Sequence, residues 1–287
     1  MTPVTYVALG DSLTEGVGDP VDGAWRGWAA LLAAGLGAPG HAVDFHNLAV
    51  SGAQTCDVRD RQTPRALTLA PDLVSVVVGV NDTLRCTFDI RTVATRLDEV
   101  YAAVTAGGAV LLTACVPDPG AMLGLPAALG RPLARRQRAV NAVVHALSER
   151  HGALHLHAAD AAWVADRTLW SADRLHPGER GHRMFAARFH ALLAAEGLAL
   201  GAPPGTESEL PPPSRAASLL WLATAGTGWV ARRCTDLLPQ LLGLAAEEVR
   251  HTVRGTGAGL DVRADHAAAA ALAGLVTSGP QAQPEAA

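Results

Sequence analysis

The sequence predicts an α/β protein in which helices cover both faces of a parallel sheet. Strand-like runs alternate strictly with segments of helical periodicity, a pattern typical of parallel sheets. The run at residues 73–78 is almost wholly apolar, as expected for a central strand that is buried on both faces. A separate apolar segment near the C-terminus predicts a helical extension to this α/β unit.

The strands and helices can be assigned in order from the N-terminus. Five apolar runs predict strands at residues 4–9, 43–48, 73–79, 109–114 and 153–156. Apolar residues at helical spacing predict helices at residues 25–36, 55–69, 90–106, 132–150 and 178–195. We therefore expect a five-stranded sheet whose strands are connected through helices.

Changes in composition divide the chain into four parts. Residues 1–197 contain the predicted α/β domain. Residues 198–215 carry Pro- and Gly-rich stretches around polar residues and predict a semi-rigid linker. Residues 216–254 predict a helical extension, and the Ala-, Gly- and Pro-rich residues 255–287 predict a disordered tail.

Bulk composition predicts a globular protein that does not bind nucleic acid. Of the 287 residues, 49% are hydrophobic and 17% charged, which is ample for a buried core. The formal net charge is -4, so no basic field attracts phosphates. The 4 cysteines are scattered and no secretory leader precedes the first predicted strand, so we expect a cytoplasmic protein with reduced thiols.

An uncharged apolar stretch at residues 216–231 raises the question of membrane contact. It is shorter than the roughly 20 residues that cross a bilayer, so we do not expect it to span one. The helical pattern over residues 216–244 leaves three roles open. These are packing within the protein, peripheral contact with a membrane surface, and contact with another subunit.

Ser12 is the strongest candidate for a catalytic nucleophile. It lies in the sequence Gly10-Asp11-Ser12, directly after the first predicted strand, where a strand-to-helix turn exposes a hydroxyl. A serine hydroxyl is a weak nucleophile at neutral pH and needs a base within hydrogen-bond reach. His176 is the candidate base, and Asp173 is the candidate partner that orients its imidazole.

Acyl transfer also needs fixed donors for the negative charge that develops on the attacked carbonyl oxygen. The N–H of Ser12, the N–H of Gly52 and the side-chain amide of Asn81 are predicted to form this oxyanion hole, because each residue follows a predicted strand. Glycine suits position 52 because it has no Cβ to block the approach of the oxygen.

In this order, the residues resemble the four sequence blocks of the SGNH or GDSL-type hydrolases. The Gly-Asp-Ser sequence at residues 10–12 resembles the first block and Gly52 the second. The Gly-Val-Asn-Asp sequence at residues 79–82 resembles the third, and Asp173 with His176 resembles the last. The resemblance covers about residues 4–198.

This resemblance implies a flavodoxin-like three-layer α/β/α sandwich and no cofactor. It also implies roles for the matching residues: Ser12 as nucleophile, His176 as base, and an oxyanion hole made by Ser12, Gly52 and Asn81. The sequence therefore predicts an esterase or lipase-like serine hydrolase that cleaves small-molecule carboxylic esters through an acyl-enzyme on Ser12. Its rate is expected to fall as His176 becomes protonated at acid pH.

Two other functions stay open at this point. An acyltransferase would use the same site to pass the acyl group to a sugar or an alcohol rather than to water. A non-catalytic binding protein would keep the fold without the reaction. It would normally have lost a catalytic residue, whereas Ser12, Asp173 and His176 are all present.

Three residues are candidates for substrate contact. The loop at residues 117–130 follows the fourth predicted strand, on the same rim as Ser12, and its Met122 and Leu123 are predicted to shape the substrate pocket. Trp170 is predicted to lie at the pocket mouth. The alternatives are a plain connecting loop and a packing role for the tryptophan.

One pair of histidines is a candidate metal site. His155 and His157 lie on one face of a predicted strand, close to Asp160. No further ligand with tight spacing accompanies them, so we predict no metal.

Overall fold

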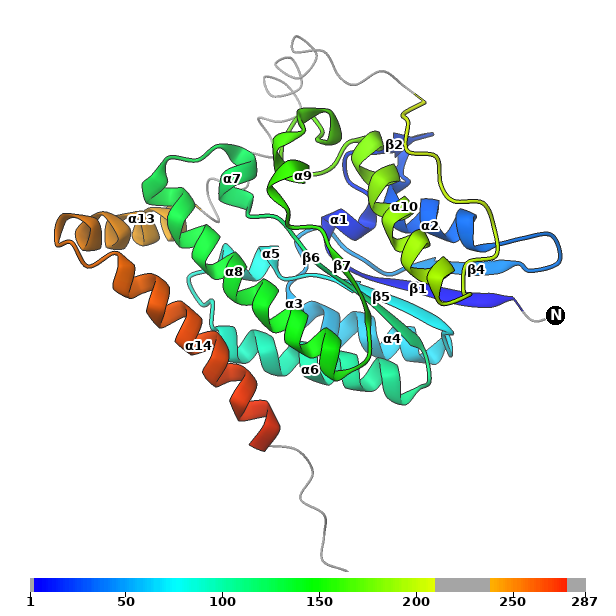
Figure 1. The fold of residues 1–287 in the computed structure, drawn as a ribbon, viewed down its shortest axis with the longest axis horizontal. Coiled ribbons are helices and arrows are strands. Elements are labelled where there is room, and N and C mark those ends of the chain that lie inside the picture. The colour runs from blue at the N-terminus through cyan, green and yellow to red at the C-terminus, as the bar shows by residue number, and fades with distance from the viewer. Residues whose placement is uncertain (1–2, 210–237, 278–287) are drawn as a thin grey trace, which may run out of the picture.

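The computed structural model describes residues 3–209 and 238–277 (Figure 1). Its centre is a 5-stranded sheet in the order β4-β1-β5-β6-β7, and all neighbouring strands are parallel. The strands are β1 (Val4–Gly10), β4 (Val43–Asn47), β5 (Leu73–Val77), β6 (Val110–Cys115) and β7 (Leu154–His157). The predicted parallel five-stranded sheet is confirmed, and its strand order is that of flavodoxin-like folds.

Helices cover both faces of the sheet, which gives the predicted three layers (Figure 1). On one face lie α2 (Gly27–Leu36) and α10 (Glu179–Ala195), and on the other lie α6 (Ile90–Ala106) and α8 (Ala127–Arg150). Side chains of β1 alternate between the two cores. Tyr6 and Ala8 pack under α2 and α10, whereas Val7 and Leu9 pack under α6 and α8.

Short elements at the ends of the strands complete this unit. They are α1 (Ser12–Glu15), α3 (Thr55–Asp57), α4 (Thr63–Thr68), α5 (Val80–Thr83), α7 (Pro119–Leu123), α9 (Ala161–Ala165) and a hairpin of β2 (Pro20–Val21) with β3 (Ala24–Trp25). A π-helical turn (Val58–Gln62) joins α3 to α4, and a 3₁₀ turn (Arg167–Leu169) follows α9.

Three predicted helix boundaries were wrong. The helix predicted from residue 25 begins at Gly27, because Trp25 pairs with Pro20 in the hairpin. The single helix predicted over residues 55–69 is divided by the π-helical turn. Helix α8 begins at Ala127 and carries Pro132 in its second turn, although a proline usually marks the first turn of a helix.

The C-terminal region is helical, as predicted, but the predicted disordered tail is wrong over most of its length. Helix α13 (Leu238–Val253) lies in the predicted extension, and α14 (Ala258–Thr277) replaces the disorder expected after residue 254. Both pack against α8, and α14 also packs against α6 (Figure 1). Alanine has the highest helix propensity, and its small side chain lets helices approach closely, so alanine-rich composition misled the prediction.

Buried charge and small side chains attach this extension to the α/β unit. Arg135 of α8 bonds Glu248 of α13 at 3.1 Å and Asp261 of α14 at 3.0 Å. Ala268 and Ala271 of α14 are buried in the core under α6 and α8. These contacts make the extension an added layer on one face of the sandwich.

The predicted linker is described only up to residue 209. In this part the chain runs back over the α/β unit, where His190 of α10 bonds the carbonyl of Gly201 at 3.2 Å. Arg183 of α10 forms an ion pair with Glu209. Residues 216–237 of the predicted helical extension at 216–254 lie outside the described residues, and so does most of the stretch at 216–244 with possible membrane contact. Among the helices that are described, none has the length and apolar character needed to cross a membrane.

Candidate active site

The candidate nucleophile lies directly after β1, at the carboxyl end of the sheet. Asp11 caps the short helix α1 by accepting a hydrogen bond from the N–H of Leu13 at 3.1 Å, and Ser12 is the first residue of that helix. Gly10 has a φ of 151° and abuts the next strand, where an added Cβ would lie 2.3 Å from the Val77 carbonyl oxygen. Only glycine fits this position, and Asp11 caps the helix, so the turn itself requires the first two residues of the Gly-Asp-Ser sequence.

A side chain that the sequence analysis missed holds this turn in place. Gln62, from the π-helical turn, accepts from the N–H of Gly10 at 2.8 Å and donates to its carbonyl at 2.9 Å. Both backbone groups at the end of β1 are thereby satisfied inside the protein. Neither spacing nor composition singles out this glutamine, because its position depends on how the chain between β4 and β5 folds.

The candidate base and its partner lie on one loop between the 3₁₀ turn and α10. Asp173 accepts hydrogen bonds through Oδ1 from the N–H groups of Leu175 and His176 and from the hydroxyl of Ser171, at 2.9, 3.0 and 2.7 Å. Arg174 between them has a φ of 58°, in the left-handed region. The carboxylate therefore fixes the tight turn that presents the imidazole.

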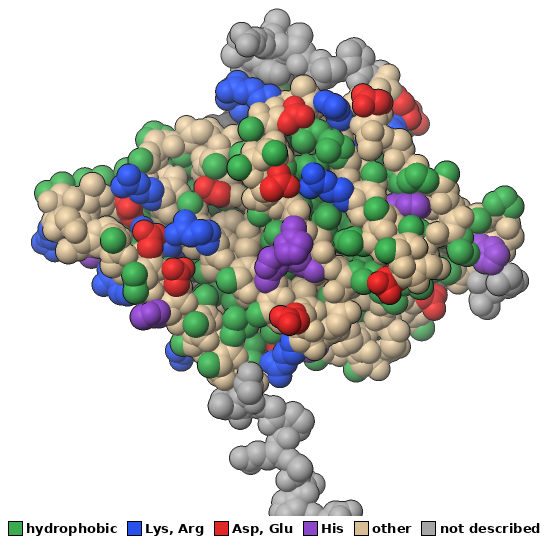
Figure 2. Space-filling view, viewed as in Figure 1, with side chains coloured by type: hydrophobic (Ala, Val, Ile, Leu, Met, Phe, Trp, Pro, Cys, Tyr) green, Lys and Arg blue, Asp and Glu red, His purple; other side chains and the backbone are tan. Residues whose placement is uncertain are grey.

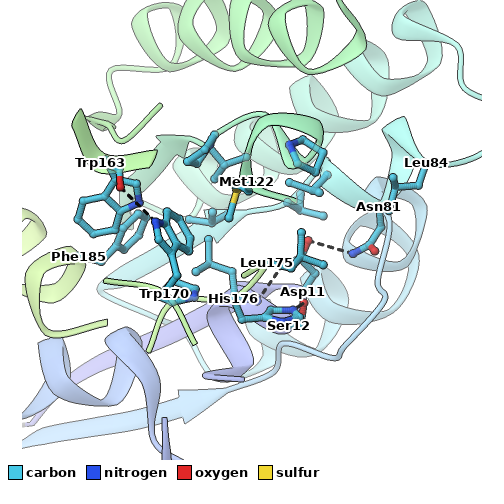
Figure 3. Close-up of a pocket in the computed structure, with 18 residues that line it drawn as sticks. Asp11, Ser12, Asn81, Leu84, Met122, Trp163, Trp170, Leu175, His176 and Phe185 are labelled. Carbon is cyan, nitrogen blue, oxygen red and sulfur yellow. Dashed lines mark hydrogen bonds between the residues drawn. The ribbon is translucent and has the colours of Figure 1, made fainter. Parts of the chain in front are cut away.

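The structure brings the serine, histidine and aspartate into one hydrogen-bonded chain. His176 Nδ1 lies 2.7 Å from Asp173 Oδ2, and His176 Nε2 lies 2.7 Å from Ser12 Oγ (Figure 3). An ionised carboxylate only accepts, so Nδ1 carries the proton and Nε2 offers its lone pair to the serine hydroxyl. Residues 164 positions apart in the chain thus meet at one point.

The aspartate stays ionised in this setting. Burial alone would raise the pKa of Asp173, but the hydrogen bond from His176, the charge of that ring when protonated and the backbone N–H donors lower the pKa to about 2. At neutral pH a full negative charge therefore faces the Nδ1 side of the imidazole. This charge stabilises an imidazolium formed when the ring accepts a proton.

Asn81 lies at the site, but its amide is already bonded. It follows Gly79 at the start of α5, and its nitrogen donates to Asp11 Oδ2 and to the Ala53 carbonyl, each at 3.1 Å. Both amide hydrogens therefore have protein acceptors. To donate a hydrogen bond to an oxyanion, Asn81 must exchange one of these two hydrogen bonds for one to the substrate oxygen.

The carboxylate of Asp11, which accepts the hydrogen bond from Asn81, has a raised pKa. Burial raises the pKa of Asp11 to about 6, although hydrogen bonds from Leu13 and Asn81 and the nearby His176 favour its charged form. Below about pH 6 the carboxyl group becomes protonated, and its hydrogen bond with the Asn81 amide weakens because a neutral carboxyl group is a poorer acceptor. The site therefore contains an acid that titrates close to neutral pH, directly beside the candidate nucleophile.

Gly52 lies in a turn after β4 and does not line the cavity. Its φ is 84°, and the preceding turn is attached to β1 by a hydrogen bond from the N–H of Val50 to the carbonyl of Gly10 at 3.3 Å. The neighbouring Ser51 bonds to Glu15, so its hydroxyl is directed to α1 and not to His176.

An apolar cavity of about 70 Å³ opens beside Ser12 and His176 (Figure 3). Met122 and Trp170 line it, in agreement with their predicted positions. Leu123 does not line it and is 36% exposed, so the prediction for this residue was wrong. The reason is helical geometry, since adjacent residues of α7 point in different directions.

The sequence analysis missed most of the apolar wall of the cavity. Its further lining residues include Leu84, Val116, Trp163, Leu175 and Phe185. Trp163 of α9 accepts a hydrogen bond at its carbonyl from the indole of Trp170, at 3.2 Å. Apolar residues at helical and strand spacing are indistinguishable from core residues in a sequence, so only the fold identifies these as pocket walls.

Comparison with known proteins shows the family of the chain. The model of the GDSL-like lipase/acylhydrolase family matches residues 8–184. The chain belongs to this family. Membership identifies it as an acylhydrolase of the esterase or lipase type. A search of curated proteins found no match.

Solved structures of esterases share the fold of this family member. Axe2, an acetylxylan esterase from Geobacillus stearothermophilus, superposes with a TM-score of 0.55 at 20% identity, over 66% of this chain and 94% of that one. The psychrotrophic esterase EstA from Pseudoalteromonas sp. gives 0.53 at 19% identity, over 67% and 97% of the two chains. TesA gives 0.53 at 22% identity, over 67% and 98%. The family match ends at residue 184, before the C-terminal helices α13 and α14.

Proposed function

We propose that this chain is a serine esterase that hydrolyses carboxylic esters of short acyl chains through an acyl-enzyme on Ser12. The observation that carries the proposal is the chain of 2.7 Å hydrogen bonds from Asp173 through His176 to Ser12. In this arrangement His176 can accept the proton of the serine hydroxyl, and the ionised Asp173 orients His176. Family membership supports the same reaction class.

The reaction proceeds in two halves. Ser12 Oγ attacks the ester carbonyl while its proton passes to His176 Nε2, and a tetrahedral intermediate forms. His176 returns that proton to the departing alcohol as the bond between carbonyl carbon and alcohol oxygen breaks. A water molecule then gives a proton to His176 and attacks the acyl-enzyme. The carboxylic acid leaves, and the proton returns to Ser12.

Asp173 and the oxyanion donors lower the barriers of both halves. Asp173 holds His176 in the tautomer that accepts from Ser12, and its charge stabilises the imidazolium. The N–H groups of Ser12 and Gly52 and the amide of Asn81 are the proposed donors to the oxyanion. Asn81 exchanges its bond to Asp11 or to Ala53 for one to the substrate oxygen, and each such donor typically lowers the barrier by about 3–4 kcal/mol.

The cavity supports a preference for short acyl chains. The cavity volume of about 70 Å³ is modest, which favours a short acyl group over a long one. Its lining is mostly apolar, which favours an alkyl group over a charged one. The fold shared with Axe2, which is named an acetylxylan esterase, agrees with a short acyl group.

A panel of p-nitrophenyl esters with graded acyl length tests this proposal. We expect kcat/KM to be highest for acetate to butyrate and to fall for octanoate and longer chains, because longer chains do not fit the cavity. A rate that rises steadily with chain length would contradict the proposed pocket. Added alcohols or sugars report the alternative reaction, since transfer products in excess of the free acid would identify an acyltransferase.

A charge placed on the cavity wall should change the chain-length preference. We expect Met122→Asp to lower kcat/KM at least about tenfold more for the butyrate than for the acetate, because each buried methylene contributes about 1–3 kcal/mol to discrimination. The matched control is Leu123→Asp, whose side chain is exposed and outside the cavity. Equal effects of the two substitutions on the ratio would show that Met122 does not bind the acyl group.

A further inference from the structure

A cluster of metal-ligating side chains lies outside the candidate active site. Cys115 at the end of β6, His145 of α8, and His155 and His157 of β7 each offer a ligand atom, and these atoms all lie within 4.8 Å of one another. None of the four residues lines the cavity beside Ser12. Figure 2 shows histidine side chains gathered on the molecular surface over β7 and α8. We propose that these four residues bind one transition-metal ion, with Zn²⁺ as the preferred ion.

The hydrogen bonds around His155 fix the tautomer that a metal ligand needs. Ser148 Oγ donates to the Val144 carbonyl at 2.6 Å, because a carbonyl only accepts. Thr113 Oγ1, at 2.6 Å from Ser148 Oγ, therefore donates to that oxygen. Thr113 has no second proton, so His155 Nδ1 at 2.9 Å must donate to it. His155 Nε2 consequently carries a lone pair and no proton.

This lone pair has no other partner in the described part of the chain. His155 Nε2 is buried and lacks a hydrogen bond there, although buried polar atoms are normally paired. A neutral imidazole whose other nitrogen donates to a protein oxygen is the usual form of a histidine metal ligand.

The ligand atoms are close to the spacing of a zinc site. The three imidazole centroids lie 4.4 to 4.9 Å apart, and each pair of rings is nearly perpendicular. In a tetrahedral zinc site, bonds of about 2.0–2.3 Å place the ligand atoms about 3.3–3.6 Å from one another. Shifts of about 1 Å in the exposed His157 and half-buried His145 would bring the set to that spacing.

The donor set selects the class of ion. One sulfur and three imidazole nitrogens suit Zn²⁺ and its soft or borderline neighbours, whereas Ca²⁺ and Mg²⁺ need oxygen ligands. Asp160, which lies close to these histidines in the sequence, does not belong to the cluster. Its carboxylate accepts from the N–H of Trp163 as the cap of α9 and pairs with Arg188.

Binding involves one proton transfer. Cys115 is buried, and its sulfur lies 3.7 Å from the Leu156 carbonyl, as expected for a weak thiol donor. The ion displaces the thiol proton, and the three imidazoles bind it through unprotonated nitrogens. Each ion bound thus releases one proton to solvent, and the net charge of the site rises by one.

The ion would cross-link three elements at the edge of the sheet. Strand β7 is the last strand of the sheet, and the ligands tie it to β6 and to α8. Asn141 of α8 already bonds both backbone groups of Val116, the residue after Cys115 that lines the catalytic cavity. The site is therefore placed to stiffen one wall of the cavity without touching the reacting atoms.

Titration with Co²⁺, a spectroscopic substitute for Zn²⁺, tests the proposal on the full chain without an oligohistidine tag. We expect one equivalent to give the visible bands of tetrahedral Co²⁺ and a thiolate-to-cobalt charge-transfer band, both abolished by an equivalent of Zn²⁺. One proton should be released per ion in weakly buffered solution. Saturating Zn²⁺ should raise the Tm by about 5 °C or more.

Three variants localise the ion. We expect the double variant His145→Ala/His157→Ala to bind Co²⁺ with an affinity at least about a hundredfold lower, because it lacks two of the four ligands. Cys115→Ala should remove the charge-transfer band, whereas the exposed His266→Ala should bind as the parent does. Three outcomes would each overturn the proposal. They are the absence of stoichiometric binding, a spectrum of the parent chain without the thiolate band, and an undiminished affinity in the double variant. Ester hydrolysis in the metal-free chain is a separate readout, so failure of this site leaves the proposed reaction untouched.

Discussion

Replacing Ser12 by alanine is expected to lower kcat for ester hydrolysis by about 10⁴-fold or more, with little change in stability. The hydroxyl is the only group of that side chain that reacts, and it bonds to His176 at 2.7 Å. Alanine has high helix propensity, so the first turn of α1 tolerates it. Initial rates on p-nitrophenyl acetate, beside circular dichroism and Tm, measure both parts of the expectation.

The matched control for this variant is Ser51→Ala. Ser51 also lies on a turn after a strand, but its hydroxyl bonds Glu15 and not the imidazole. We expect its activity to stay within about threefold of the parent, because it touches no proposed reacting atom. Near-normal hydrolysis by Ser12→Ala would exclude Ser12 as nucleophile, and an equal loss in both variants would indicate damage to the loops instead.

Replacing Asp173 by asparagine is expected to lower kcat by about 10⁴-fold while the fold persists. The amide oxygen can still accept from the N–H groups of Leu175 and His176, so the turn keeps its local bonds. The amide nitrogen, however, donates to His176 Nδ1 and drives the ring to the tautomer that cannot accept from Ser12. Steady-state kinetics on the same ester measure the loss.

The control for this substitution is Asp166→Asn, which changes another aspartate that accepts from a nearby backbone N–H. Asp166 caps the 3₁₀ turn through Thr168 and lies outside the cavity. It should retain activity within about threefold of the parent. A comparable loss in Asp166→Asn, or high activity in Asp173→Asn, would contradict the assigned role of Asp173.

Acid stability gives a second readout of Asp173. Its pKa is about 2 in the folded chain, against about 3.9 in an unfolded one, so its ionised form stabilises the fold above about pH 4. That contribution is lost as pH falls toward 2. The Tm difference between the parent and Asp173→Asn should therefore shrink over this interval, and a difference that is independent of pH there would contradict the assigned pKa.

The proposed reacting residues could be predicted because each lies in a short local sequence pattern. Gly10 needs a backbone that other residues rarely adopt and abuts a neighbouring strand, which forces glycine two residues before the proposed nucleophile. Asp173 and His176 lie three residues apart because the carboxylate bonds the backbone of the turn between them. Alternating strands and helices predicted the sheet for a similar reason, since hydrophobic periodicity is local.

Features that depend on distant segments were not predictable. Gln62 reaches Gly10 from a π-helical turn, and His145 reaches His155 and His157 of strand β7 from helix α8. Helix α14 was taken for a disordered tail because its alanines carry no amphipathic pattern, although Ala268 and Ala271 are buried against α6 and α8. Leu123 was chosen beside Met122 because a loop prediction does not specify which residues point inward.

The central claim is that His176 makes Ser12 a nucleophile. Treatment with a p-nitrophenyl alkylphosphonate, followed by intact-mass and peptide mass spectrometry, tests it most directly. We expect one phosphonyl group per chain, attached to Ser12, with inactivation in step with labelling and strongly slowed labelling in Asp173→Asn. A chain that stays unlabelled while it hydrolyses esters, or a label on another residue that accompanies the loss of activity, would contradict the claim.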